Sequence, residues 1–567
     1  MSQIVNETIE NLKKRIIATI NFAKSEKLLP ETELPEFIIE VPANKDNGDF
    51  STNVAMISAK IFKMAPIKIA EIIKQNLDLT NSLFDRVEIA GAGFINFFLN
   101  DMFYAKILND ILEKSDNYGH SDFGKNKRVM VEFVSANPTG PMHMGNARGG
   151  ALGDCLASVL EACGYNVHRE FYVNDAGNQI DKFAMSLDIR YQQLFNSDSN
   201  IELPEDSYHG EDIIDLARKF SLVNGDKYLN VDEKVRRKAL VDFALPKNIE
   251  KMKSDLTKYR IKYDEWFYES SLHKSGEIEE VIDILKNQGL TYENDGALWY
   301  KAKSHSLEKD EVIIRRNGTY TYFIVDVAYH YNKFVTRKFD LCIDLLGADH
   351  HGHVQRMKSI MYDLGIDGSR LNVLLFQLVR LVKNNEVVKM SKRTGRAIQL
   401  SDLLDEVPVD AARFIFNMKE ANSQMDFDLD LAKKQDSQNP VYYVQYAHAR
   451  ICSILRTLKN DSITPCKCTL DKLLKLTTPE EKDLIRHLSN YTNELTEAAK
   501  NYDPARITRY VVDLATHFHK FYTICRVKTD NENLMMARLS LCIAVKTVIK
   551  NILTMFKISV PETMANE

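Results

Sequence analysis

The sequence of 567 residues lacks the features that define several classes of protein. It has no uninterrupted apolar run of about 18 residues, the length that a membrane-spanning helix requires, so we expect no membrane span. The N-terminus, MSQIVNETIENLKKR, is polar and predicts a helix rather than a signal peptide. No internal repeat or low-complexity segment is visible. These absences favour an ordinary globular protein.

The eight cysteines lack any CxxC pair. They are scattered at positions 155, 163, 342, 452, 466, 468, 525 and 542. This argues against a structural zinc site and a disulfide framework, and it favours a reducing cytoplasm. Cys466 and Cys468 form a lone CxC without a second ligand pair, so we expect no metal there.

Charge is distributed unevenly along the chain. The net charge is −5, but residues 431–567 carry 20 Lys and Arg against 14 Asp and Glu, so residues 1–430 hold a net −11. A basic C-terminal third on an acidic body indicates a region that meets a polyanion, although an uneven surface without such a role is an alternative.

The length and the residue patterns predict three domains. Residues 1–120 combine a periodic apolar helix with strand-like stretches at 37–42 and 87–99, which predicts a small α+β domain. After about residue 400 strands should vanish, and amphipathic helices such as 441–458 and 507–525 predict an all-α domain at 401–567.

The middle of the chain, residues 121–400, predicts an α/β domain. VMVEFVSAN (129–137), a helix of small residues ending at Gly164, and NVHREFYVND form a βαβ unit. A polar, helical stretch at about 195–290 is expected to be an insertion. Strand-like runs at 297–302, 312–316, 319–334, 341–353 and 371–382 then complete a split Rossmann-type, doubly wound parallel sheet.

The segment NPTGPMHMGNARGG (137–150) lies where the first strand of this unit should turn into a helix. The free amides of a helix N-terminus at the C-terminal edge of a parallel sheet favour a bound phosphate. Gly145 lacks a Cβ where an adenine ring could approach, and His143 can donate a hydrogen bond to an α-phosphate. An isolated histidine is more often structural, but its place in this turn favours a function.

The octapeptide VKMSKRTG (388–395) is a second candidate for phosphate binding. Lys389 and Lys392 flank Met390 and Ser391, and their two ammonium groups can neutralise the β- and γ-phosphates of ATP while pyrophosphate departs. The alternative is a solvated basic surface loop.

A third segment, GADHHGHVQR (347–356), follows an apolar strand, so Gly347, Asp349 and His350 should emerge at the ligand edge of the sheet. Asp349 could accept hydrogen bonds from ribose hydroxyls. The histidines at 350, 351 and 353 could instead bind zinc or nickel, but consecutive residues on such a turn point in diverging directions.

The two phosphate-binding candidates, in this order and 246 positions apart from His143 to Lys389, resemble the HIGH and KMSKS signatures of class I aminoacyl-tRNA synthetases. The chain departs from that pattern at Asn146, which replaces a second histidine and cannot be charged, and at Arg393, which replaces a final serine. GADHHGHVQR, GDFSTN (48–53), AGAGFINFFL (90–99), FYVNDAGNQ (171–179) and NPVYYVQYAHAR (439–450) resemble arginyl-tRNA synthetases over nearly the full length.

This resemblance implies an arginine–tRNA ligase that uses arginine, ATP with Mg²⁺ and tRNA(Arg), works as a monomer and holds no structural metal. The implied catalytic residues are His143, Asn146, Lys389 and Lys392; the ATP-binding residues are Gly145, Gly347, Asp349, His350, Met390 and Ser391; the arginine-binding residues are Glu132, Asn137, Tyr322, Asp326 and Gln355. Two carboxylates flanking a planar guanidinium would select arginine over lysine. Tyr446 and Arg450 would contact tRNA, although a Tyr-rich helix face more often belongs to the core.

Three alternatives remain open on the sequence. One is a synthetase for another amino acid, with lysine as the chemical neighbour. Another is a nucleotidyltransferase with a HIGH-type motif that never binds tRNA, which would leave the C-terminal domain without a purpose. The last is a synthetase paralogue that binds RNA without catalysis, against which the intact His143, Lys389 and Lys392 argue.

Overall fold

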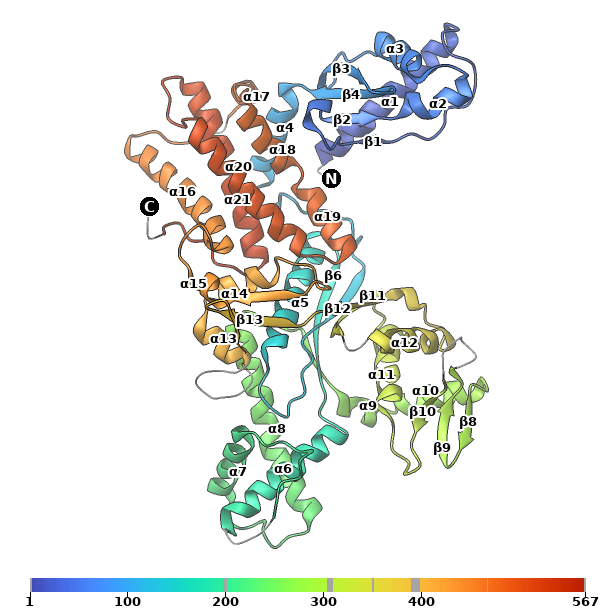
Figure 1. Ribbon diagram of the computed structural model, residues 1–567, viewed down its shortest axis with the longest axis vertical. Helices are drawn as coiled ribbons and strands as arrows, with labels where there is room; N and C mark the ends of the chain where they lie inside the picture. Colours follow the sequence, from blue (N-terminus) through green and yellow to red (C-terminus); the bar gives the residue numbers. More distant parts are fainter. Residues whose placement is uncertain are drawn as a thin grey trace.

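The computed structural model describes residues 3–196, 201–302, 309–348, 351–388, 398–466 and 468–564. An antiparallel N-terminal unit, a central parallel sheet with two inserted units, and a helical C-terminal part follow one another along the chain (Figure 1). Among the described residues, no helix combines the length and the apolar character that a membrane crossing requires.

The N-terminal unit stands apart at one end of the molecule (Figure 1). It consists of α1 (Gln3–Ser25), β1 (Ile39–Glu40), β2 (Phe50–Thr52), α2 (Val54–Phe62), α3 (Pro66–Asn76), β3 (Phe84–Ala90) and β4 (Phe94–Leu99). The strands form an antiparallel sheet in the order β1-β2-β4-β3. In α1, the buried Leu12, Ile16 and Ile20 recur every four residues and form one apolar face, as the sequence predicted.

The central sheet and the turns at its edge include several of the predicted site residues. Its elements are β5 (Arg128–Glu132), α5 (Met144–Ala162), β6 (Asn166–Val173), β7 (Glu265–Tyr268), β11 (Leu341–Gly347) and β12 (Leu371–Phe376). The five strands are all parallel, in the order β12-β11-β5-β6-β7. The predicted βαβ unit is therefore present as β5, α5 and β6, and the predicted fold class is confirmed. The register places Asp344, Glu132 and Glu170 side by side on three neighbouring strands.

The predicted insertion at 195–290 was wrong in its extent. A helical unit does interrupt the sheet, and it is built from α6 (Asn178–Phe195), α7 (Glu211–Asn224) and α8 (Glu233–Lys258) around a small core that includes Phe183 and Phe220. Strand β7, however, lies inside the predicted range and pairs with β6. The sequence pattern did not reveal this strand of four residues, because the segments next to it are helical and charged.

The second inserted unit differs more from the prediction. It contains α9 (Glu269–Ser275), α10 (Glu277–Asn287), β8 (Thr291–Asn294), β9 (Ala297–Tyr300), β10 (Glu311–Ile314), α11 (Tyr322–Tyr331) and α12 (His351–Asp363). The runs at 297–302 and 312–316 do not join the parallel sheet, because β8, β9 and β10 form a separate antiparallel sheet.

The run at 319–334 is a helix and not a strand. Helix α11 continues into a π-helix at Asn332–Thr336. The run contains β-branched and aromatic residues, and eight of its ten α-helical residues are buried, so it lacks the polar face that identifies a surface helix.

The C-terminal part is mostly helical, as predicted. It comprises α13 (Leu400–Glu406), α14 (Val409–Phe416), α15 (Leu429–Lys433), α16 (Pro440–Asn460), α17 (Leu470–Leu473), α18 (Pro479–Ser489), α19 (Tyr491–Asn501), α20 (Ala505–Ile524) and α21 (Glu532–Met555). Strands do not vanish at residue 400, however: β15 (Met425–Asp428) pairs with β13 (Val379–Lys383), which also pairs with β14 (Glu386–Val388).

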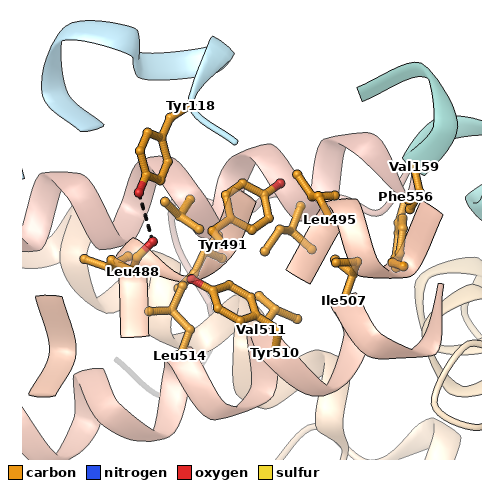
Figure 2. Packing of buried hydrophobic residues seen from close by; sticks show 14 of the residues in the cluster. Tyr118, Val159, Leu488, Tyr491, Leu495, Ile507, Tyr510, Val511, Leu514 and Phe556 are labelled. Atoms are coloured by element: carbon orange, nitrogen blue, oxygen red, sulfur yellow. Dashed lines mark hydrogen bonds between the residues drawn. The ribbon is translucent and has the colours of Figure 1, made fainter. Parts of the chain in front are cut away.

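One apolar core joins the helical part to the central domain. Tyr491 and Tyr510 stack with ring centroids 5.5 Å apart, and Val159 of α5 lies in the same cluster (Figure 2). Tyr118, which follows α4 (Asp101–Lys114), donates its hydroxyl to the carbonyl of Leu488 at 3.0 Å. Helix α5, which begins at the predicted phosphate-binding turn, is thus anchored against the C-terminal bundle.

Candidate active site

The turn between β5 and α5 is fixed by a reciprocal cap. His143 is the N-cap residue of α5, and its Nδ1 accepts a hydrogen bond from the backbone N–H of Gly145 at 3.1 Å. The side-chain oxygen of the buried Asn146 accepts from the backbone N–H of His143 at 2.9 Å. Asn146 therefore stabilises the start of the helix.

The cap also determines how His143 can act. Because Nδ1 accepts a hydrogen bond, the neutral ring carries its proton on Nε2. Desolvation lowers the pKa of His143 below its ordinary value, which favours this neutral form. The exposed ring is therefore suited to donate one hydrogen bond from Nε2.

Gly145 leaves room for the ring of His143. A Cβ at this position would lie 2.9 Å from Cε1 and 3.1 Å from Nδ1 of the His143 ring. This close contact gives a reason for glycine in addition to the approach of an adenine ring that the sequence suggested.

The segment after the lysine motif lies against the same turn. His143 and Gln399 form an antiparallel bridge, and the N–H of Leu400 donates to the carbonyl of Met142 at 2.9 Å. Six predicted site residues, namely Lys389, Met390, Ser391, Lys392, Asp349 and His350, lie outside the described residues. Gly347 is described and ends β11, paired with Phe376 of β12.

A cavity of about 840 Å³ opens at the carboxyl end of β5 and β11. Glu132, Tyr322 and Asp326 all line it, so the structure brings three of the predicted arginine-binding residues together. Asn137 and Gln355 do not line it, and both are exposed where the structure describes them. Four carboxylates, those of Glu132, Glu269, Asp326 and Asp344, line it and suit a cationic ligand.

Asp326 is held by two histidines. His330, one helical turn further along α11, lies 3.2 Å from it through Nδ1, and Nε2 of His353 also contacts its carboxylate. Burial opposes ionisation of Asp326, but the facing histidines outweigh it and hold its pKa below the ordinary value. Burial alone would lower the pKa of His330, but the carboxylate of Asp326 outweighs this effect and raises the pKa to about 10. Asp326 is thus a charged, oriented acceptor.

Several cavity residues were missed by the sequence reasoning. The wall includes Tyr172, Asn174 and Glu269, and the hydroxyl of Tyr172 donates to Glu269 at 2.7 Å. Burial raises the pKa of Glu269 to about 7. The motif FYVNDAGNQ contains Tyr172 and Asn174 and could have identified them, whereas Glu269 lay in the supposed insertion.

The predicted tRNA contacts lie in a separate cavity of about 690 Å³ on the helical part. The guanidinium of Arg450 is 4.8 Å from the ring centroid of Tyr446 and 5.1 Å from that of Tyr522. Arg526 and Lys528 line the same cavity. Aromatic rings beside cations suit the stacking of an unpaired base.

Comparison with known proteins identifies the family. Residues 107–452 match the family described as tRNA synthetases class I (R), catalytic domain, and residues 444–564 match the DALR anticodon binding domain. Together with the parallel sheet and its capped turn, these matches define a class I aminoacyl-tRNA synthetase. Residues 6–99 match the arginyl tRNA synthetase N terminal domain. The chain belongs to the arginyl-tRNA synthetase family.

Individual relatives agree with this assignment. The chain is 53% identical to an arginine–tRNA ligase of Acetivibrio thermocellus, with 99% of this chain and 100% of the relative covered. It is 54% identical to an arginine–tRNA ligase of Caldanaerobacter subterraneus, with complete coverage of both. The structure of Thermus thermophilus arginyl-tRNA synthetase shares the fold, with a TM-score of 0.73 and 20% identity over 98% of this chain and 100% of that one.

Proposed function

We propose that this chain attaches arginine to tRNA(Arg) in two steps. Arginine first attacks the α-phosphorus of ATP through its carboxylate, which forms arginyl-adenylate and releases pyrophosphate. The terminal ribose hydroxyl of the tRNA then attacks the activated carbonyl carbon and releases AMP. The observation that carries the proposal is the convergence of Glu132, Tyr322 and Asp326 on one acidic cavity at the sheet edge where His143 caps α5.

The side chain of arginine would occupy this cavity. A guanidinium offers five donors in one plane, and the charged Asp326 together with Glu132 supplies acceptors that match it. Tyr322 can accept a further hydrogen bond or stack on the guanidinium. Asn137 and Gln355 stay predictions for other parts of the substrate, because neither lines the cavity.

Catalysis in the first step would rest on charge stabilisation at the phosphates. We assign to His143 the donation of a hydrogen bond from Nε2 to the α-phosphate, and to Asn146 the support of that ring through the cap. Lys389 and Lys392 would neutralise the departing pyrophosphate. The remaining proposed ATP contacts are Gly145, Gly347, Asp349, His350, Met390 and Ser391. Mg²⁺ would enter as part of the ATP substrate.

The tRNA would contact the helical part. Arg450 and Tyr446 are proposed to stack against an unpaired base, with the positive charges of Arg526 and Lys528 near its phosphates. We further propose that the protein acts as a monomer in the cytoplasm, as the sequence predicted.

A charging assay with radiolabelled amino acid, ATP and total tRNA tests the activity. The native chain should charge tRNA with arginine and not with lysine; the opposite preference would refute the proposal.

Asp326→Asn should raise the KM for arginine about 100-fold while the KM for ATP changes little, because a charge-assisted hydrogen bond is lost. Asp283→Asn, the same substitution on the exposed face of α10, is the control. Lys392→Ala tests the lysine motif separately, since an unchanged rate would remove only that role.

A further inference from the structure

A lysine that does not line the cavity sits directly behind its carboxylates. We propose that Lys333 is a positioning residue that keeps Glu132 and Asp344 both ionised, so that these carboxylates can face a guanidinium. The inference rests on the proposed function, because it concerns the site assigned to the arginine side chain.

The contacts of Lys333 place it between the two carboxylates. Its Nζ lies 2.7 Å from Oε2 of Glu132, 2.9 Å from Oδ1 of Asp344 and 3.0 Å from Oδ2 of Asp344. The lysine side chain is fully buried, whereas Glu132 and Asp344 both line the cavity. Its ammonium therefore acts on a ligand only through these two carboxylates.

The sheet explains why a cation is needed here. Asp344, Glu132 and Glu170 are register partners on adjacent parallel strands, so three carboxylates lie side by side in a buried place. Neighbouring buried carboxylates cannot all stay ionised without cations. Lys333 supplies the positive charge for Asp344 and Glu132, and Arg337 supplies it for Glu170 through a hydrogen bond of 2.8 Å.

The helix geometry brings these cations to the sheet. Asp326, His330 and Lys333 are spaced by four and three residues, the spacing of one helix face. At Asn332 the α-helix changes to a π-helix, a rare geometry that is frequent at functional sites. Both Lys333 and Arg337 project from this segment and its end toward the three strands.

Several charged and polar groups surround Lys333 and its two carboxylates. Facing groups come from β5, β6, β11, α11, the π-helix and α12: Glu132, Glu170, Cys342, Asp344, Asp326, Tyr329, His330, Arg337 and His353. Lys333 contacts Glu132 and Asp344, and His330 contacts Asp326 and Asp344. Arg337 contacts Glu170 and Glu265. Lys333 therefore lies where it can neutralise part of the negative charge of both Glu132 and Asp344.

The ionisation of the pair depends on Lys333. Burial lowers the pKa of Lys333, but Asp344 and Glu132 outweigh this effect and raise it above its ordinary value, so the lysine stays charged. Burial raises the pKa of Glu132 above its ordinary value, and the Lys333 ammonium limits that rise. Burial also opposes ionisation of Asp344, but Lys333 and His330 outweigh it and hold its pKa below the ordinary value. Without the ammonium, Glu132 and Asp344 would share a proton near neutral pH.

A double-mutant cycle tests the inference through the KM for arginine, measured at pH 6.5 and pH 8.5. Lys333→Met should raise this KM about tenfold at pH 6.5 and restore it toward the native value at pH 8.5, because the shared proton is then lost. Asp344→Asn should raise it about tenfold at both pH values, because Lys333 then neutralises the charge of Glu132 alone. Lys333→Met with Asp344→Asn removes one charge of each sign and should return the KM to within about threefold of native.

The controls separate this inference from a structural role and from the proposed function. The KM for ATP should stay near native in all three variants, and Lys286→Met, on the exposed end of α10, should behave as the native chain. Two results would overturn the inference. One is a KM for arginine in Lys333→Met that depends on pH as in the native chain. The other is a KM for arginine in the double variant as high as in the single variants. Should Lys333→Met fail to fold, Asp344→Asn and the double variant still decide it. If Asp326→Asn and Glu132→Gln leave the KM for arginine unchanged, the proposed arginine site itself is wrong.

Discussion

His143 and Gln399 form an antiparallel bridge, although they come from distant parts of the sequence. On either side of it, the N–H of Met144 donates to the carbonyl of Ile398 at 3.2 Å, and the N–H of Leu400 donates to the carbonyl of Met142 at 2.9 Å. The chain that leaves the lysine motif is thereby fixed to the residue that caps α5. The described residues that follow the lysine motif and the cap of α5 are therefore joined by backbone hydrogen bonds.

The position of the His143 ring should control the first chemical step. Gly145→Ala places a Cβ where His143 now lies, so the ring must move. We expect the rate of arginine-dependent pyrophosphate exchange, assayed with tRNA present, to fall about 10- to 100-fold with little change in the KM for arginine. Gly140→Ala in the same turn is the matched control, since its Cβ would meet only Asp212 at 3.6 Å. Equal rates in the two variants would contradict the role of the ring.

The stacked arginine of the helical part should affect tRNA and not the small substrates. Arg450→Gln removes the cation that lies over Tyr446 and Tyr522, and we expect the KM for tRNA to rise about tenfold. Charging kinetics at saturating arginine and ATP measure this effect. Lys475→Gln removes the same charge from an exposed site outside the cavity and should change the KM for tRNA by less than about twofold. A similar effect of both variants would indicate general charge attraction only.

The buried Glu269 should make stability depend on pH. Its pKa is raised to about 7 in the folded chain by burial, above that of an unfolded glutamate, so the folded state binds more protons between these two values. Stability should therefore fall as the pH rises from about 4.5 to 7, by up to about 1.4 kcal/mol per pH unit from this group. Below about pH 4.5 this group should cause no further change in stability, because Glu269 is then protonated in both the folded and the unfolded state.

Glu269→Gln isolates this contribution, because the amide can still accept the hydrogen bond from Tyr172. The variant should gain stability over the native chain as the pH rises from 5 to 7.5, by about 2–3 kcal/mol in total. The difference is measured from the denaturant midpoint of the transition in which the catalytic domain unfolds, determined for both proteins between pH 5 and pH 7.5. A difference that does not vary with pH would show that Glu269 is ionised in the fold throughout.

The residues that were predicted from the sequence are those with a local signal. The βαβ unit followed from an apolar strand, a Pro-Gly turn and a helix of small residues, and α1 from the four-residue spacing of Leu12, Ile16 and Ile20. Glu132 and Asp326 were identified through the resemblance, and the cavity brings them together. The assignments to Lys389 and Lys392 stay predictions.

The prediction failed where burial on several sides removed the periodic pattern. Helix α11 has few polar positions and was taken for a strand, which hid the one-face spacing of Asp326, His330 and Lys333. The strand β7 was too short to stand out from its helical neighbours. In both elements, contacts with the rest of the fold outweigh the local preference of the residues.

The sequence by itself determined the family, the order of the domains and the positions of the two candidate phosphate-binding motifs, because these depend on residues close together in the chain. Only the tertiary structure decided which charges face one another at the floor of the proposed arginine cavity. Strand register places Asp344 beside Glu132, and the π-helix brings Lys333 between them. Such contacts arise from residues about 200 positions apart and leave no pattern along the chain.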